Sequence, residues 1–165
     1  DNIKLNRDSV DLVKLTEETL RAVRRGLHKH TVSQVFDRPT ILVNADRQRI
    51  AEVLHNLLDN AVKYSPDGGA VVVRGRLLGD EVEVSVQDEG IGIPQADLER
   101  VFERFYRSES EIHSHTAGVG LGLAVCRGVV ETHGGRIWAE STLNEGTTIY
   151  FTLPAVKETA TFNSE

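Results

Sequence analysis

A valine-rich segment in the middle of the chain places the tightest constraint on its fold. Ala70–Leu78 and Glu81–Gln87 alternate apolar with polar residues, and Gly79-Asp80 forms a two-residue turn between them. Alternation with a period of two predicts a β-hairpin with one apolar and one polar face. The apolar face needs a covering layer, and an amphipathic helix is expected just before it, at Asp46–Tyr64, where a Ser-Pro-Asp-Gly-Gly sequence ends the helix.

The other elements are predicted from the same two patterns, the strand period of two and the helical period of 3.6. Strands and helices do not alternate strictly along the chain. We therefore predict an α/β two-layer sandwich with a mixed sheet of about five strands, a small N-terminal strand pair and about three main helices on one face. The further segments expected are helices at 11–27, 95–105 and 120–132 and strands at 32–36, 40–43, 136–140 and 147–153. The polar stretch Arg107–Thr116 has no periodicity and is predicted to be a flexible lid.

The composition excludes several classes of protein. With 165 residues, of which 39% are hydrophobic and 27% charged, the chain suits one globular domain. The formal net charge of −6 argues against a general nucleic-acid binder, because phosphate backbones attract clustered lysine and arginine. No apolar segment approaches the roughly 20 residues that cross a bilayer. The single cysteine, Cys126, fits a reducing, cytoplasmic compartment.

Three polar residues share one side of the helix expected at Asp46–Tyr64. Asn56, Asn60 and Lys63 are spaced i, i+4 and i+7, so they project away from the apolar face. Amide oxygens are ligands suited to Mg²⁺, and a lysine one turn further along can meet phosphate charge. A solvated polar face explains the same residues equally well, and the helix alone leaves both interpretations open.

A glycine-rich segment directly follows the valine-rich hairpin. In Asp88-Glu89-Gly90-Ile91-Gly92-Ile93-Pro94, the alternate glycines allow a ligand to approach the backbone closely. Asp88 can accept a hydrogen bond from an exocyclic amine such as adenine N6. On this segment alone an ordinary turn is the favoured interpretation, because the third glycine and the opening helix of a dinucleotide site are absent.

A second glycine-rich segment, Gly118–Leu123, leads into the helix expected from residue 120. Free amide groups at a helix N-terminus bind anions, and glycines let a phosphate approach them. Here the phosphate interpretation is favoured over a loosened helix start. Between the two glycine segments, the aromatic pair Phe102 and Phe105 is most simply assigned to the core. Arg107, at the entry to the lid, can act as a charge clamp on a terminal phosphate.

Taken in order and with these gaps, the motifs resemble those of the GHKL ATPase superfamily, and within it the histidine-kinase catalytic domain. His55–Tyr64 resembles the N box and Asp88–Ile93 the first glycine box, while Val101–Tyr106 is similar to the F box and Gly118–Leu123 to the second glycine box. The resemblance covers nearly the whole chain, from residue 10 to residue 154. It implies a Bergerat-type α/β sandwich that holds ATP between the N-box helix and the lid.

The resemblance also implies roles for individual residues. Asn60 would ligate Mg²⁺ with help from Asn56, and Lys63 would contact phosphate, while Asp88 would read adenine. Arg107 matches a lid arginine that acts on the γ-phosphate, so Asn56, Lys63 and Arg107 are the implied catalytic residues. The implied nucleotide-binding residues are Asn56, Asn60, Lys63, Tyr64, Asp88, Gly90, Gly92, Ile93, Phe105, Gly118, Gly120, Leu121 and Gly122.

Two positions depart from patterns common in the superfamily. Hydrolytic members such as gyrase place a glutamate base where this chain has Asn56, and an amide cannot take a proton from water. The site therefore resembles a kinase that passes phosphate to a protein nucleophile. Val119 stands where the second glycine box often has threonine or serine, so a side-chain contact there is in doubt, whereas the backbone contacts are not.

The phosphoacceptor of such kinases is a histidine in a helical hairpin, in a His-Glu-x-x-Thr-Pro-like context. None of the six histidines here has that setting. The resemblance thus implies a separate dimerisation domain as partner, a receiver domain of a response regulator downstream, a homodimeric parent and a monomeric fragment. Because the sequence begins at Asp1, we expect a piece of a longer protein, and a membrane anchor in that parent stays open. We assign residues 1–9 to a linker remnant, 10–154 to the catalytic domain and 155–165 to a flexible tail.

Three other functions stay open at this point. The first is a degenerate nucleotide-binding module that signals through ATP occupancy without phosphotransfer. The second is a hydrolytic ATPase or a serine-directed anti-sigma kinase, against which Asn56 and the segment around Phe102 and Phe105 speak. The third is an interaction domain that binds no nucleotide.

Overall fold

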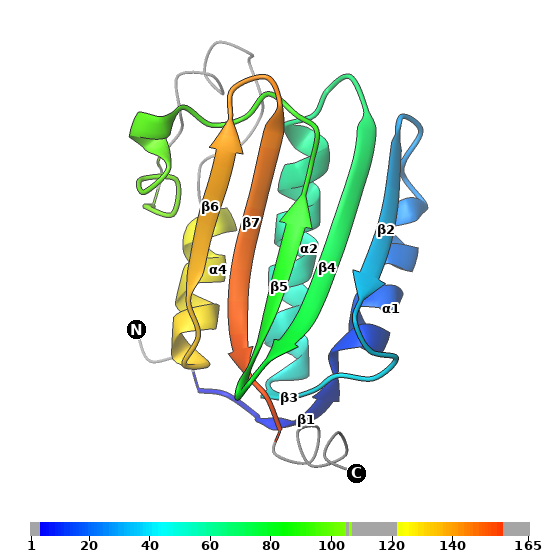
Figure 1. Ribbon diagram of the computed structural model, residues 1–165, viewed down its shortest axis with the longest axis vertical. Helices are drawn as coiled ribbons and strands as arrows, with labels where there is room; N and C mark the ends of the chain where they lie inside the picture. The colour runs from blue at the N-terminus through cyan, green and yellow to red at the C-terminus, as the bar shows by residue number, and fades with distance from the viewer. Residues whose placement is uncertain (1–3, 105, 107–121, 157–165) are drawn as a thin grey trace.

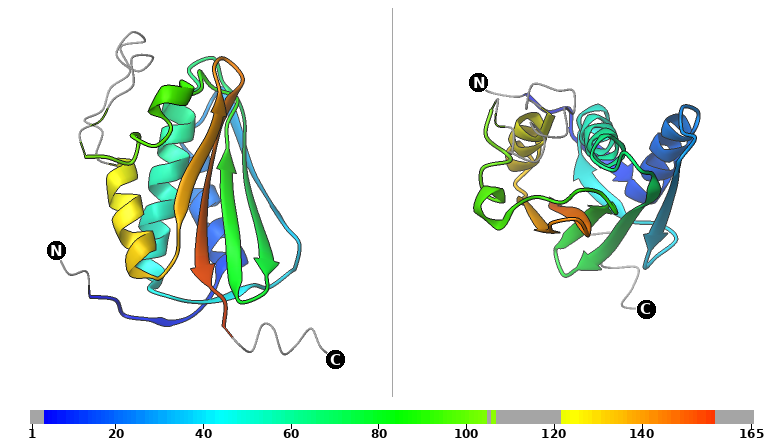
Figure 2. Two further views of the ribbon diagram at one scale, coloured as in Figure 1. Left: turned by 60° about the vertical axis from the view of Figure 1, so that its left-hand side comes forward. Right: turned by 90° about the horizontal axis from the view of Figure 1, so that it is seen from above.

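The fold is one sheet with helices covering one of its faces. The computed structural model describes residues 4–104, 106 and 122–156. Five strands form a mixed sheet in the order β2-β4-β5-β7-β6, and the α-helices of the described residues lie side by side against one face (Figures 1 and 2). The predicted two-layer α/β sandwich is therefore confirmed.

The sheet contains both parallel and antiparallel strand pairs, as predicted. β2 runs parallel to β4, and the other neighbours in the sheet are antiparallel. The β4–β5 hairpin turns at Gly79-Asp80, as the alternating valines indicated. The strands of this sheet are β2 (His30–Phe36), β4 (Gly69–Leu78), β5 (Glu81–Gln87), β6 (Ile137–Thr142) and β7 (Gly146–Pro154). The helices are α1 (Leu12–Arg24), α2 (Arg47–Lys63) and α4 (Gly122–Thr132).

The small strand pair consists of β1 (Asp8–Asp11) and β3 (Leu42–Ala45), which are antiparallel. The strand expected at 32–36 is part of β2, which lies at one edge of the main sheet and not in the small strand pair. Residues 8 and 9, which the sequence placed in the lead-in, already belong to β1. A four-residue strand has too few alternations to be visible in a sequence, and β1 exists because β3 offers it a partner.

The helix expected at 95–105 is wrong. The described part of this segment contains a single 3₁₀ turn, η1 (Gln95–Asp97), followed by further turns. The N–H groups of Arg100 and Glu103 bond to carbonyls three residues back, at 2.9 Å each, which is the pattern of turns rather than of an α-helix. Too few apolar residues recur at helical spacing here to hold an α-helix against the sheet.

α2 connects the two ends of the molecule through the centre of the helical layer (Figure 1). Asp46 caps its N-terminus by accepting the backbone N–H groups of Gln48 and Arg49. Its apolar face is fully packed against the sheet, and each large side chain buried there contributes about 1.5–3 kcal/mol. The buried residues of α2 are Ile50, Val53, Leu54, Leu57, Leu58 and Ala61. No helix in the described ranges is both long and apolar enough to cross a bilayer.

Candidate functional site

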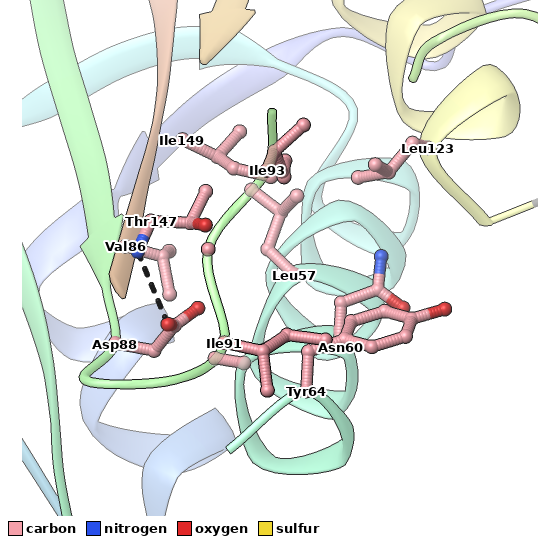
Figure 3. A pocket seen from close by; sticks show the side chains of 12 residues that line it. Leu57, Asn60, Tyr64, Val86, Asp88, Ile91, Ile93, Leu123, Thr147 and Ile149 are labelled. Carbon is pink, nitrogen blue, oxygen red and sulfur yellow. Dashed lines mark hydrogen bonds between the residues drawn. The ribbon is translucent and has the colours of Figure 1, made fainter. Parts of the chain in front are cut away.

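A pocket opens at the C-terminal end of α2, between this helix, the loop after β5 and the start of β7 (Figure 3). The empty space in and in front of it, part of which is open solvent, is about 470 Å³. The walls are mostly apolar, and a few polar groups converge on them. The pocket is lined by Leu57, Asn60, Ala61, Tyr64, Val86, Asp88, Ile91, Gly92, Ile93, Leu123, Thr147 and Ile149.

Asp88 is the buried acid of this pocket, with a side chain that is 9% exposed. It follows the last residue of β5, so the strand places it at the pocket wall. Its Oδ1 accepts the backbone N–H of Gly90 at 2.9 Å and that of Thr147 at 3.2 Å. Among the described residues the structure records no hydrogen bond to Oδ2. Burial raises the pKa of Asp88 to about 6, although the two backbone bonds act against that rise.

The glycines of the loop after β5 are required by close packing. A Cβ on Gly90 would lie 2.1 Å from the carbonyl oxygen of Tyr64, and the next residue, Ile91, donates its N–H to that same oxygen at 2.9 Å. Gly92 has a φ of +77°, and a Cβ there would lie 2.4 Å from the carbonyl oxygen of Thr142. The glycines thus let the loop lie against the end of α2 and the β6–β7 turn, which closes one wall of the pocket.

The polar residues of α2 do not all reach the pocket. Asn60 and Tyr64 line it, while Lys63 is exposed and is not among the lining residues. Asn56 is half-buried one turn before Asn60, and its side chain is near enough to the thiol of Cys126 on α4 to act against the rise in the pKa of that thiol, while the thiol itself donates to the carbonyl oxygen of Val53 at 3.9 Å. Burial raises the pKa of this thiol to about 12, so it remains protonated. The structure therefore brings Asn60 to the candidate site and directs Asn56 towards α4.

The start of α4 completes the side of the pocket next to Asn60. Leu123 lines the pocket, and a Cβ on Gly122 would lie 3.9 Å from the Asn60 side-chain nitrogen. The described end of the second glycine segment, Gly122 and Leu123, thus lies beside the N-box helix. Five further predicted site residues lie outside the described residues: Phe105, Arg107, Gly118, Gly120 and Leu121.

Several residues of the pocket were missed from the sequence, and Thr147 is the most informative of them. Its backbone N–H bonds to Asp88 because β7 pairs with β5 in a register that sets Thr148 opposite Gln87. That pairing joins residues about sixty positions apart, so no local pattern could reveal it. Ile91 fell within the first glycine segment, but its side chain was not assigned a role. Val86 and Ile149 had no signal beyond that of ordinary inward-facing strand residues.

Comparison with protein families decides the assignment. A model described as "Histidine kinase-, DNA gyrase B-, and HSP90-like ATPase" matches residues 45–157. The chain belongs to this family. Its relatives include sensor histidine kinases, and it is homologous to the ATP-binding catalytic domain that these kinases of two-component systems carry.

Two relatives show the extent of this homology. The sensor histidine kinase WalK of Bacillus subtilis (strain 168) is 39% identical over 159 residues, which cover 94% of this chain and 26% of WalK. The adaptive-response sensory kinase SasA of Synechocystis sp. (strain PCC 6803) is 37% identical over 150 residues, which cover 88% of this chain and 38% of SasA. The chain thus spans well under half the length of these kinases.

Solved structures agree with the fold. The mycobacterial sensor histidine kinase MprB superposes with a TM-score of 0.79 at 32% identity, covering 90% of this chain and 97% of that one. The ShkA kinase in complex with AMPPNP gives 0.78 at 26% identity, covering 94% and 32%. The ThkA kinase in complex with the response regulator TrrA gives 0.76 at 28% identity, covering 92% and 42%.

Proposed function

We propose that this chain transfers the γ-phosphate of ATP to a histidine on a separate dimerisation domain, as the catalytic domain of a two-component sensor histidine kinase. The phosphohistidine would then pass its phosphate to an aspartate of a response-regulator receiver domain. One observation carries the proposal: a buried aspartate faces an apolar pocket in a chain that belongs to an ATPase family.

The pocket suits an adenine base. The apolar side chains of Leu57, Ile91 and Ile149 line the pocket and can pack against a purine ring. The Oδ2 of Asp88 can accept a hydrogen bond from the exocyclic amine at N6, which guanine lacks. The homologue ShkA was crystallised with the ATP analogue AMPPNP. These points support ATP as the ligand and Asp88 as the residue that selects adenine over guanine.

The residues next to the pocket also suit Mg²⁺ bound through phosphate. In the described ranges, no group of three histidine, cysteine, aspartate or glutamate side chains could hold a metal ion. Mg²⁺ is typically held by one or two protein oxygens together with substrate phosphates and water. Asn60 lines the pocket and carries an amide oxygen, and its side-chain nitrogen lies next to the start of α4, so this residue fits that mode of binding. When bound, Mg²⁺ would neutralise phosphate charge, and Lys63 and Arg107 would contribute further positive charge.

Phosphotransfer to a protein, rather than hydrolysis, is supported by the residue at position 56. Asn56 carries an amide, which cannot accept a proton from water, and its side chain lies near the neutral thiol of Cys126. In the proposed step, a histidine nitrogen of the partner domain attacks the γ-phosphorus, the bond to the bridging oxygen breaks and ADP leaves. ThkA was crystallised with its response regulator TrrA, in agreement with a downstream receiver domain.

We further propose how the chain is placed in its parent. The segment before β1 would continue from the phosphoacceptor hairpin, and residues 10–154 would form the catalytic domain. Residues 8 and 9 belong to the same fold through β1, and so does Ala155, whose N–H donates to the carbonyl oxygen of Asp80 at 2.8 Å, so the expected linker and tail bounds are corrected at these residues. The parent would be a homodimer through its dimerisation domain, with this domain in the cytoplasm.

The test of the proposal is a phosphotransfer assay with γ-labelled ATP and a supplied phosphoacceptor domain of the parent kinase. We expect acid-labile phosphohistidine on that domain and almost no label on this chain alone. Nucleotide binding without phosphohistidine would instead identify a regulatory module that has lost transfer. Rapid release of free phosphate would identify a hydrolase.

The metal assignment has its own matched pair of variants on one helix. Asn60→Ala should abolish the gain in nucleotide affinity on adding Mg²⁺, because it removes the amide oxygen at the pocket. Asn56→Ala should preserve much of that gain, since Asn56 is not among the residues that line the pocket. Isothermal titration with AMPPNP, with and without Mg²⁺, measures both. Equal Mg²⁺ dependence in wild type and Asn60→Ala would refute the assignment.

A further inference from the structure

The turn that joins α2 to β4 begins beside the pocket, and several hydrogen bonds hold it in place. Ser65, the first residue after Tyr64, is 3% exposed. Its hydroxyl donates to the carbonyl oxygen of Ala61 at 2.5 Å, and its own carbonyl accepts the N–H of Gly68 at 2.9 Å. The end of α2 and the turn are therefore one rigid unit.

The start of β2 holds this turn from its outer side. The Nε2 of His30 lies 2.7 Å from the carbonyl oxygen of Ser65 and 3.0 Å from its hydroxyl oxygen. Because a carbonyl oxygen only accepts, Nε2 carries the proton and donates. Beside it, the N–H of Gly69 donates to the carbonyl oxygen of Lys29 at 3.2 Å. A Cβ on Gly68 would lie 2.4 Å from the same Lys29 oxygen, so the two backbones are in direct contact.

The inner side of the same turn is bonded to the loop that carries Asp88. The Tyr64 carbonyl accepts the N–H of Ile91 at 2.9 Å, and a carboxylate oxygen of Glu89 accepts the N–H of Ala70 at 2.7 Å. Tyr64 and Ile91 both line the pocket (Figure 3). A displacement of the turn would therefore move two walls of the pocket together.

We propose that His30 is a positioning residue for the nucleotide pocket. It lies in β2, the edge strand of the sheet, and does not line the pocket itself. Its Nε2–H fixes the Ser65 carbonyl, which in turn fixes the neighbouring Tyr64 carbonyl that anchors the Asp88 loop. This inference rests on the proposed nucleotide site and adds a residue that acts on it through the α2–β4 turn.

The bond geometry of the side chain provides a sharp test. In glutamine the amide nitrogen is separated from Cβ by as many bonds as Nε2 is in histidine, whereas in asparagine it is one bond closer. His30→Gln can therefore still donate to Ser65, while His30→Asn and His30→Ala cannot. Loss of a single hydrogen bond of this kind should weaken nucleotide binding by about 3- to 10-fold.

The experiment is isothermal titration of the full chain and the three variants with Mg²⁺-AMPPNP, together with their thermal unfolding midpoints. The inference predicts wild-type affinity for His30→Gln and an affinity reduced about 3- to 10-fold for His30→Asn and His30→Ala. The amide NMR signal of Ile91 should shift in the last two variants and remain in place in His30→Gln.

The outcomes separate cleanly. If wild type binds AMPPNP and all three variants bind equally well, His30 has no positioning role, even where the unfolding midpoint falls. Equal weakening in all three variants would also overturn the inference, because the donor would not be the cause. If His30→Ala does not fold, the AMPPNP affinities of His30→Gln and His30→Asn test the inference by themselves. Failure of wild type to bind would refute the proposed function itself and is recognised before any variant is measured.

Discussion

A buried aspartate lies at each end of α2: Asp46 caps its N-terminus, and Asp88, which follows β5, lies near its C-terminus. The pKa values of the two carboxyl groups are shifted in opposite directions. At the N-terminal end, Asp46 is 6% exposed and accepts backbone N–H groups from Asn6 at 3.0 Å, Gln48 at 3.1 Å and Arg49 at 3.2 Å. The bond from Asn6 is the largest cause that lowers its pKa below the usual range. At the C-terminal end, burial raises the pKa of Asp88 to about 6.

The N-terminal end is also closed by a histidine. His133, which is 1% exposed at the end of α4, accepts the N–H of Asp46 on Nε2 at 3.0 Å and donates from Nδ1 to the carbonyl of Val129 at 2.8 Å. Burial lowers the pKa of His133, so it is neutral and can accept. A buried carboxylate whose oxygens accept backbone hydrogen bonds, such as Asp46, stabilises the fold. A buried carboxylate with an oxygen that faces a pocket, such as Asp88, indicates a ligand site.

Substitution of the two aspartates should give the largest effects, and Asp88 should affect nucleotide affinity most. Asp88→Asn keeps an acceptor at Oδ1 but replaces Oδ2 with an amide that cannot accept from adenine. We expect AMPPNP affinity to fall about 10- to 100-fold and selectivity for ATP over GTP to decline, while folding stability at neutral pH is unchanged or slightly higher. Isothermal titration and urea unfolding measure both. Wild-type affinity and selectivity in this variant would show that the base binds elsewhere.

The opposite result is expected at the other end of the helix. Asp46→Ala removes the helix cap and the acceptor for Asn6, so the free energy of unfolding should fall by about 1–2 kcal/mol. Nucleotide affinity should stay within about twofold of wild type, because the pocket lies at the other end of a 17-residue helix, about 25 Å away. Urea unfolding followed by circular dichroism tests the first part. A large loss of affinity in a folded Asp46→Ala protein would contradict the division of roles.

A smaller effect is expected from pH, with opposite signs at the two ends. Because the Asp88 pKa is raised, its contribution to stability is present below its ordinary pKa of 3.8 and is lost as pH rises through about 6. Asp46 has a lowered pKa, so its contribution is lost as pH falls below 3.8. His133 also has a lowered pKa, and stability should fall as pH drops below 6.5, where the unfolded chain takes up a proton.

Nucleotide affinity should follow the ionisation of Asp88. Oδ1 already accepts two backbone N–H groups, so a proton would lie on Oδ2, where it opposes the N–H of the adenine amine. Affinity should drop about fourfold from about pH 8 to about pH 5.5. In Asp88→Asn the profile over this range should be flat apart from ionisation of the nucleotide itself, which a titration with ADP controls. A wild-type profile with no inflection near the Asp88 pKa would count against this residue as the base-binding acid.

The parts of this comparison that could be predicted from the sequence are those carried by local patterns. The apolar face of α2, its aspartate cap and the alternating valines of β4 and β5 all have short-range signals. Asp88 was found because it ends a strand before a glycine-rich segment. The family resemblance added the roles, and residues of the N box and of the first glycine box line one pocket together with Leu123.

The parts that were missed depend on pairings distant along the chain. Thr147 reaches Asp88 through the β5–β7 register, and β1 forms only because β3 lies beside it. The Asn56 side chain faces α4 because helix packing decides its direction, which spacing along α2 did not specify. The helix expected at 95–105 failed because periodicity over one or two turns does not secure an α-helix.

The most direct test is an amide NMR titration of the full chain with Mg²⁺-AMPPNP. If an adenine nucleotide binds between the end of α2 and the Asp88 loop, the signals of Asn60, Tyr64, Asp88 and Thr147 should shift together and saturate at one nucleotide per chain. The signals of Asp46 and His133 should stay nearly unchanged. Shifts confined to the Asp46 end, or none at about millimolar nucleotide, would contradict the account.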